Sequence, residues 1–141
     1  MFVFAVAFIS HLLSDAVPHW DYPLASLIKK GDAKEWRQTP ASLKTDLLRT
    51  GFDALAGVAL VFLIIRPKTR QEFFWASAAA LGGILPDFLQ GVYYIGGEPR
   101  WLAPLQNFHQ KIHSKIALGP YPLIGIPFQI LIAGTALWIL L

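Results

Sequence analysis

The chain of 141 residues contains no cysteine. Disulfide bonds and thiolate metal sites are therefore excluded, and any metal ion must be held by imidazole, carboxylate, carbonyl or water ligands. Charge is also scarce, because charged residues make up only 15% of the chain and hydrophobic residues 55%. This composition, with a mean hydropathy of +0.48, departs from that of soluble proteins and favours an integral membrane protein.

Several signatures of membrane enzymes are missing from the sequence. It has no HExxH motif of zinc proteases, no Pro-Ser-Gly-His motif of acid-phosphatase-like lipid phosphatases and no glycine-rich nucleotide loop. The first apolar stretch also does not fit a signal peptide, because Lys and Arg are absent before it and it contains His11 and Asp15. We therefore interpret that stretch as a transmembrane helix.

The hydrophobic pattern predicts an all-α integral membrane protein, a single domain over 1–141 with about four transmembrane helices. The helix signals include a Thr39-Pro40 start, a capping box at Thr69-x-x-Glu72, and glycines at 82, 83 and 91 that permit close helix contact. The predicted spans are about 1–17, 46–66, 71–94 and 120–141, with a loop at 22–39 and a short amphipathic helix at 104–118 before the last span.

Ionisable residues gather near one membrane face of this arrangement. With spans running in alternating directions, incidental polar residues should scatter in depth, whereas these lie at the same ends of their helices. The set consists of His11, Asp15, Asp46, Asp53, Asp87, His109 and His113. We interpret Asp46 as a solvated charge on a helix face and the others as candidates for a site.

Helical spacing sharpens this prediction. His11 and Asp15 are four residues apart, as are His109 and His113, so each pair shares a helix face and can present two side chains to one ion. Asp87 follows Pro86, which removes a backbone donor and can aim the carboxylate into a cavity. A divalent cation would compensate such a group of acids and imidazoles inside a bilayer. The predicted ligands are His11, Asp15, Asp87, His109 and His113.

Three motifs in the chain resemble those of a known family. They are Ser10-His11-Leu12-Leu13-Ser14-Asp15-Ala16-Val17-Pro18-His19-Trp20-Asp21-Tyr22, Gly83-Ile84-Leu85-Pro86-Asp87 and His109-x3-His113-Ser114. They are similar to motifs of small prokaryotic membrane-bound metal-dependent hydrolases, the YdjM-like family. The motif order is permuted here, and an earlier helix with a Thr-His-x-x-x-Gly start is absent. The resemblance implies a metal site built from the same five ligands, a hydrolase activity and a multi-pass protein of the prokaryotic cytoplasmic (inner) membrane.

The expected cofactor is one or two divalent metal ions, zinc first, with manganese, iron or magnesium as alternatives. Because the site lies near the lipid headgroups, the expected substrate is a lipid or lipid-linked phosphoester. Asp53 could take a proton from water, His19 could contact substrate or support catalysis, and Asp21 could likewise contact substrate or support the metal ligands. A simple ion pair with Arg49 would equally explain Asp53. Arg49, Lys111 and Lys115 are predicted to steer phosphate.

Other functions stay open at this level. The same His and Asp residues could serve an ion or proton transporter or carrier, or a metal-binding module without catalysis. Haem is excluded because two histidines four apart on one helix cannot both be its axial ligands. The expected partners are membrane lipid and a second copy of the chain, without nucleic acid, because the basic residues lie between apolar segments.

The distribution of Lys and Arg predicts an orientation. Nine lie in loops on the side of the site and three on the other, so the positive-inside rule favours a cytoplasmic site with both termini outside. The nine are Lys29, Lys30, Lys34, Arg37, Lys44, Arg49, Arg100, Lys111 and Lys115, and the three are Arg66, Lys68 and Arg70.

Overall fold

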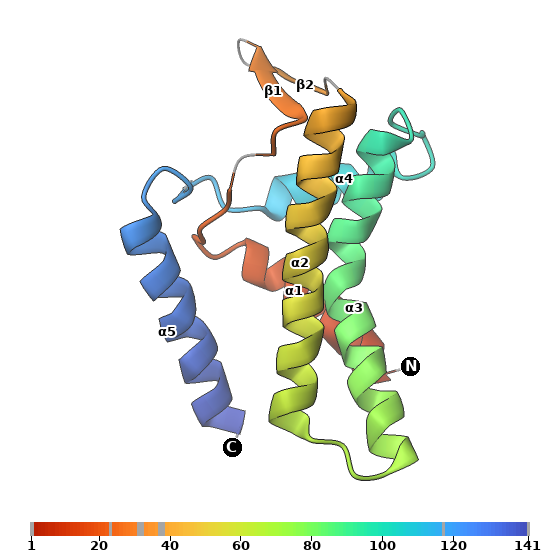
Figure 1. Ribbon diagram of the computed structural model, residues 1–141, viewed down its shortest axis with the longest axis vertical. Helices are drawn as coiled ribbons and strands as arrows, with labels where there is room; N and C mark the ends of the chain where they lie inside the picture. The colour runs from red at the N-terminus through yellow and green to blue at the C-terminus, as the bar shows by residue number, and fades with distance from the viewer. Residues whose placement is uncertain (1, 23, 31–32, 37–38, 117, 141) are drawn as a thin grey trace.

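The computed structural model describes residues 2–22, 24–30, 33–36, 39–116 and 118–140, and within these the protein is mainly helical, with one short two-stranded hairpin (Figure 1). This confirms the predicted helical class. The elements are α1 (Phe2–Asp15), β1 (Leu27–Lys30), β2 (Ala33–Trp36), α2 (Pro40–Ile65), α3 (Arg70–Ile95), α4 (Ala103–Ile112) and α5 (Pro122–Leu140). Parts of the predicted loop, and the predicted span ends at residues 1 and 141, lie outside the described residues.

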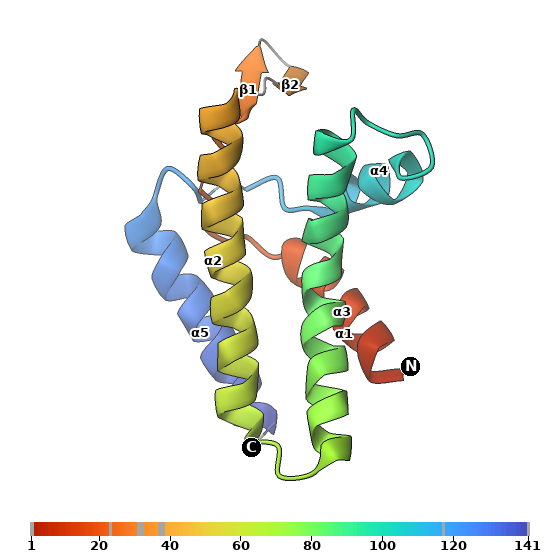
Figure 2. The ribbon, with the colours of Figure 1, turned by 45° about the vertical axis from the view of Figure 1, so that its right-hand side comes forward.

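Two long helices, α2 and α3, stand side by side and run in opposite directions (Figure 1). Helix α1 crosses behind them and packs on α3, and the short α4 lies against both α1 and α3. Helix α5 lies on the side of α2 away from α3, as Figure 2 also shows. The sequence is thus folded so that α1, α3 and α4 meet, and these are the helices that carry most of the predicted ligands.

The ends of α2 and α3 follow the predicted capping signals. Thr39 caps α2 through its side chain, which accepts a hydrogen bond from the Ser42 N–H, and Pro40 occupies the first turn. Thr69 and Glu72 form the predicted capping box of α3. These interactions satisfy N–H groups that have no partner within the helix, so both starting points were predictable from sequence.

Helix α1 approaches α3 closely because residue 82 is glycine. A Cβ atom at Gly82 would lie 2.5 Å from the Phe4 carbonyl oxygen and 3.1 Å from the Ala7 Cβ. At Gly83 and Gly91, by contrast, a Cβ would have no neighbour within 4 Å among the described residues. The prediction that glycines permit helix contact is therefore confirmed for Gly82 and wrong for the other two.

Residues 22–39 were predicted as a loop, but part of this segment forms an antiparallel hairpin of β1 and β2. Leu27 pairs with Trp36 and Lys30 with Ala33. In the sequence, Gly-Asp at 31–32 is a dipeptide typical of hairpins and could have predicted this one; these two residues lie outside the described part of the chain. The alternation of polar and apolar residues that usually identifies a strand is weak here, since charged residues occupy much of the segment.

Asp46 was predicted to be a solvated charge on a helix face, and this prediction is wrong. The residue is buried, with an exposed fraction of 5%. Its carboxylate accepts hydrogen bonds from the backbone N–H groups of Ala25 and Ser26, both at 2.8 Å, and from the Ser26 hydroxyl. Asp46 therefore attaches the turn before β1 to the side of α2. Sequence spacing alone could not predict this, because the partners are about 20 residues away.

The amphipathic helix predicted at 104–118 is shorter than expected. Helix α4 ends at Ile112, and His113 leaves the helical conformation with φ −55° and ψ 135°. The chain then turns back toward α1, where the Ser114 N–H donates to the Asp15 carbonyl oxygen at 2.7 Å. His109 and His113 consequently do not share a helix face.

Apolar side chains cover much of the outside of the described structure, and several polar ones lie inside it. Phe52, Leu55, Leu123 and Trp138 are 72%, 71%, 91% and 82% exposed. The buried polar residues are Ser26, Asp46, Gln106 and His109. By length and composition one helix, Ala41–Ile65 of α2, could cross a membrane, whereas the apolar helices Phe2–Asp15 and Pro122–Trp138 are shorter. This criterion therefore supports one span among the described residues and not the four that were predicted from sequence.

Candidate metal centre

Four predicted ligands converge from three helices. We call His11 and Asp15 of α1, Asp87 of α3 and His109 of α4 the inner cluster; one ligand atom of each lies within 4.8 Å of the others. The spacing of four along α1 places His11 and Asp15 on one face, as predicted. The packing of α1 and α4 on α3 then brings Asp87 and His109 to that face.

The two distances from His11 within the inner cluster fit ligands around one ion, whereas His109 and Asp15 lie closer together, at hydrogen-bonding distance. Two atoms bound tetrahedrally at zinc distances are about 3.3 Å apart. The Nε2 atom of His11 lies 3.3 Å from Asp15 Oδ2 and 3.4 Å from Asp87 Oδ1. His109 is 3% exposed, and its Nε2 lies 2.5 Å from Asp15 Oδ2, in hydrogen-bonding contact.

The Nε2 atom of His11 is buried and, within the described part of the chain, has no hydrogen-bond partner. An unsatisfied buried polar atom is unfavourable, so its presence in a folded protein requires an explanation. Here the nitrogen faces two carboxylates, Asp15 and Asp87. Nitrogen and carboxylate oxygen atoms arranged in this way are the donor set that zinc, manganese or iron accepts. The residues present therefore fit a divalent cation.

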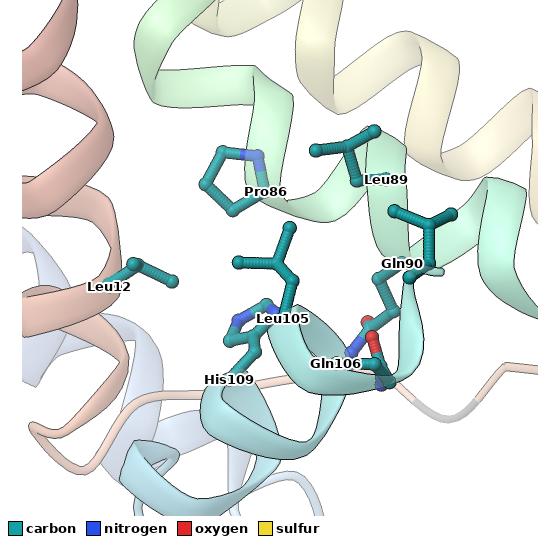
Figure 3. A pocket seen from close by; sticks show the side chains of 8 residues that line it. Leu12, Pro86, Leu89, Gln90, Leu105, Gln106 and His109 are labelled. Carbon is teal, nitrogen blue, oxygen red and sulfur yellow. The ribbon is translucent and has the colours of Figure 1, made fainter. Parts of the chain in front are cut away.

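A small cavity of about 10 Å³ adjoins His109 (Figure 3). It is close to the minimum that holds one water molecule. Its walls come from α1, α3, α4 and the residue before α4, namely Leu12, Pro86, Leu89, Gln90, Leu102, Leu105, Gln106 and His109. The mainly apolar lining leaves His109 directed at the acids rather than at solvent.

A second group of ligand-type residues lies beside the first. We call His19, Asp21 and His113 the outer cluster; one ligand atom of each lies within 4.8 Å of the others. Asp21 Oδ2 is 3.2 Å from His19 Nε2 and 3.6 Å from His113 Nε2. The rings of His113 and His109 have centroids 6.3 Å apart, so the two clusters are neighbours.

The outer cluster arises from an alternation in the segment after α1. In extended backbone, side chains two residues apart point the same way and adjacent ones point oppositely. His19 and Asp21 accordingly meet each other, while the rings of Trp20 and Tyr22 pair with centroids 6.0 Å apart. His-Trp-Asp-Tyr in the sequence could have indicated this arrangement, but Asp21 was not among the predicted ligands.

The electrostatics of the outer cluster favour a charged carboxylate. Burial by itself would raise the pKa of Asp21, but the contact with His113 and the charges of His19 and His113 outweigh burial, so the pKa lies below its ordinary value. The contact with Asp21 is the main reason that the pKa of His113 is raised, and burial opposes it. The cluster thus presents a negative charge between two imidazoles.

His113 was predicted as a ligand of the same site as the other four residues. The structure instead places it in the outer cluster, because α4 ends one residue before it. His19, predicted as a catalytic or substrate-contact residue, also lies in the outer cluster. The inner cluster therefore contains four of the five predicted ligands. The outer cluster contains the fifth, His113, together with His19 and Asp21.

Two further predicted site residues lie on α2, outside both clusters. They are Asp53, predicted to accept a proton from water, and Arg49, predicted to steer phosphate. Tyr22 donates a hydrogen bond of 2.6 Å to Asp53 Oδ2, and the Arg49 guanidinium lies 5.9 Å from the centre of the Tyr22 ring. Burial and the bond to Asp53 raise the pKa of Tyr22. These residues line an open groove of about 610 Å³, formed by Trp20, Tyr22, Leu48, Arg49, Phe52 and Asp53. Lys111 and Lys115 are exposed, on and just after α4.

Comparison of the chain with family models, with curated proteins and with solved structures found no match.

Proposed function

We propose that the protein is a membrane-embedded, metal-dependent hydrolase that acts on a lipid or lipid-linked phosphoester at the level of the headgroups. The observation that carries the proposal is the inner cluster, in which two imidazoles and two carboxylates from three helices meet around a buried nitrogen of His11 that has no hydrogen-bond partner among the described residues. The resemblance of the three sequence motifs to the YdjM-like hydrolases supports the same reaction class.

The distribution of polarity supports a membrane location. Large apolar side chains such as Leu55 and Leu123 face outward, and the described core contains Gln106 and His109. In water such a surface would be unfavourable, whereas in a bilayer the apolar side chains meet lipid. We propose that α3, with 26 residues and a length of about 39 Å, crosses the membrane beside α2, and that α1 and α5 are embedded with them in a prokaryotic cytoplasmic membrane.

The residues of the chain would divide the work as follows. His11, Asp15, Asp87 and His109 would hold a divalent cation, which would supply a Lewis acid to activate water and polarise a phosphoryl oxygen. Asp53 is the candidate acceptor for the proton of the attacking water, since it lies outside both clusters. Arg49, beside it in the groove, would pair with the phosphate.

The groove suits an amphiphilic substrate. Trp20, Leu48 and Phe52 offer apolar contact to a lipid chain, while Arg49 and Asp53 offer polar contact to its headgroup. In hydrolysis the water oxygen bonds to phosphorus, the ester P–O bond breaks, and the leaving alkoxide takes a proton. Trp20 and Tyr22, which line the groove, flank Asp21 of the outer cluster in sequence. The groove is therefore next to the outer cluster along the chain.

The proposal is tested with detergent-purified protein reconstituted into liposomes. Metal content is measured by elemental analysis, and release of phosphate or of the lipid alcohol is followed from phosphatidic acid and from a polyprenyl phosphate. Wild type is compared with Asp87→Asn and His109→Gln, and with Glu98→Gln as a matched carboxylate change outside both clusters. We expect metal and hydrolysis in wild type and in Glu98→Gln, and loss of hydrolysis and of the inner-cluster metal in the other two. Metal binding with ion flux and without turnover would favour a carrier instead.

A further inference from the structure

The outer cluster has the donor set of a metal site in its own right. Two imidazole nitrogens and one carboxylate oxygen converge, and the separations of 3.2 Å and 3.6 Å about Asp21 Oδ2 match ligands sharing one ion. His19 and Asp21 come from the segment after α1, and His113 comes from the end of α4. The three are thus brought together by the fold and not by local spacing alone.

Both histidines have Nδ1 against a backbone carbonyl oxygen, which suits Nε2 as the metal-binding atom. The Nδ1 atom of His19 lies 2.8 Å from the Val17 carbonyl oxygen, and the Nδ1 of His113 lies 3.3 Å from that of Ser114. A carbonyl oxygen can only accept, so each Nδ1 carries a hydrogen, and in the neutral ring each Nε2 then has a lone pair for a metal ion. Hydrogen bonds of this kind orient most metal-bound histidines in proteins.

The backbone that carries Asp21 is fixed by the start of α5. Trp20 donates from its indole nitrogen to the Gly119 carbonyl oxygen at 3.2 Å, and Gln129 donates to the Trp20 carbonyl oxygen at 3.1 Å. A Cβ at Gly119 would lie 2.6 Å from the Asp21 carbonyl oxygen, and one at Gly125 would lie 2.6 Å from the Trp20 Cβ. This packing gives α5 a role: it positions an outer-cluster ligand.

We propose that His19, Asp21 and His113 hold a second divalent cation beside the one at the inner cluster, so that the protein contains a two-cation centre. The inference rests on the proposed metal-dependent function, because it takes the inner cluster as the first site. It reassigns His19 from catalysis to metal binding and makes Asp21 a ligand.

The two sites differ in the number and burial of their ligands. The inner cluster offers four protein ligands, of which His109 is buried, and the outer cluster offers three, none of them buried; each cluster has one exposed aspartate. Four-ligand sites are typically closed, whereas three-ligand sites keep a position for water or substrate. The inner cation is therefore the tightly held one. The outer cation exchanges faster and is the one that a phosphate oxygen of the substrate can reach.

Metal stoichiometry tests this inference directly. Detergent-purified protein is loaded with zinc, freed of excess by gel filtration and measured by elemental analysis; a chromogenic chelator then follows release of the ions. We expect two zinc ions per wild-type chain, released in two phases, and one slowly released ion in Asp21→Asn and in His113→Gln. Glu98→Gln should behave as wild type. The manganese-loaded wild type should give the electron paramagnetic resonance spectrum of a coupled pair, which the variants lose.

The outcomes separate this inference from the proposed function. Two ions in both outer-cluster variants, or one ion in wild type that both variants retain, would overturn the second site and leave the inner one standing. Two ions in wild type and one in each variant, without hydrolysis by any of them, would support the second site and reject the hydrolase. Circular dichroism checks that each variant keeps its helical content, and the two variants change different segments, so a folding defect in one does not decide the test.

Discussion

His11 contributes a buried nitrogen that faces two carboxylates. We expect His11→Ala to lower zinc affinity at the inner cluster by more than about 100-fold, the upper end of the loss seen when even an outer-shell partner of a metal ligand is removed. Ser10→Ala, a change at the exposed neighbouring position, should leave zinc affinity unchanged. Competition with a chelator of known affinity measures both, and equal affinities would show that His11 is not a ligand.

Asp46 connects α2 to the turn before the hairpin. Replacing it with asparagine puts an amide N–H₂ group against donors, so Asp46→Asn should destabilise the protein by about 1–3 kcal/mol. Asp53→Asn on the same helix should cost less, because Asp53 is exposed. Denaturant unfolding in detergent, followed by circular dichroism, compares the two; an equal loss would mean that burial of Asp46 contributes nothing.

At the scale of residues, sequence spacing predicted which side chains belong to the site better than it predicted how they are grouped. His11 and Asp15 could be paired because a helix fixes the geometry of residues four apart. His113 could not be placed correctly, because the predicted helix over 104–118 ends at Ile112, one residue before it. Asp21 was predicted as a supporting or substrate-contact residue and not as a ligand, because its partner His113 is distant in sequence and only tertiary structure brings them together.

At the scale of elements, the contact of α1 with α3 depends on Gly82. Gly82→Ala would place a methyl group against the backbone of α1, so we expect a loss of about 1–3 kcal/mol, typical of overpacking. The neighbouring Gly83→Ala meets no atom within 4 Å among the described residues and should stabilise the helix by up to about 1 kcal/mol. Thermal unfolding in detergent measures the difference, and the same sign for both would contradict the packing.

Helix α5 is attached to the segment that carries His19 and Asp21, because Gln129 donates a hydrogen bond to the Trp20 carbonyl oxygen. Gln129→Leu removes the hydrogen bond to the Trp20 carbonyl oxygen without changing any ligand, so it should speed release of the outer zinc ion and leave the inner one unaffected. Thr135→Val, an exposed position on the same helix, is the matched control. Chelator kinetics resolve the two phases; a change in the slow phase alone would mean that α5 does not position Asp21.

Helix starts at Thr39 and Thr69 were predictable because capping is local chemistry. The β1–β2 hairpin and the end of α4 were missed for the opposite reason. The hairpin carries a weak hydrophobic alternation, and α4 stops where the backbone of Ser114 bonds to Asp15 in α1. Local signals do not encode a helix end that is imposed by a distant partner.

At the scale of the molecule, the absence of cysteine in the natural sequence permits single-cysteine labelling without background. Lys68 precedes α3 and Arg100 follows it, both exposed, about 39 Å of helix apart. If α3 spans the membrane as proposed, Lys68→Cys should react with an impermeant maleimide from outside the cell, and Arg100→Cys only in inverted vesicles. Labelling of both from one side would reject that span, and reversed labelling would reject the orientation predicted from charge.

The segment of residues 19 to 22 contributes to both the groove and the outer cluster. Trp20 and Tyr22 line the groove, and His19 and Asp21 belong to the outer cluster. Binding of a lipid in the groove and binding of a cation at the outer cluster would therefore be energetically linked. Any shift in this backbone that favours an ion at Asp21 also moves the Tyr22 ring, and thermodynamic reciprocity requires each ligand to change the affinity for the other by the same factor. A lipid seated in the groove would thus act as an effector of metal affinity as well as a substrate.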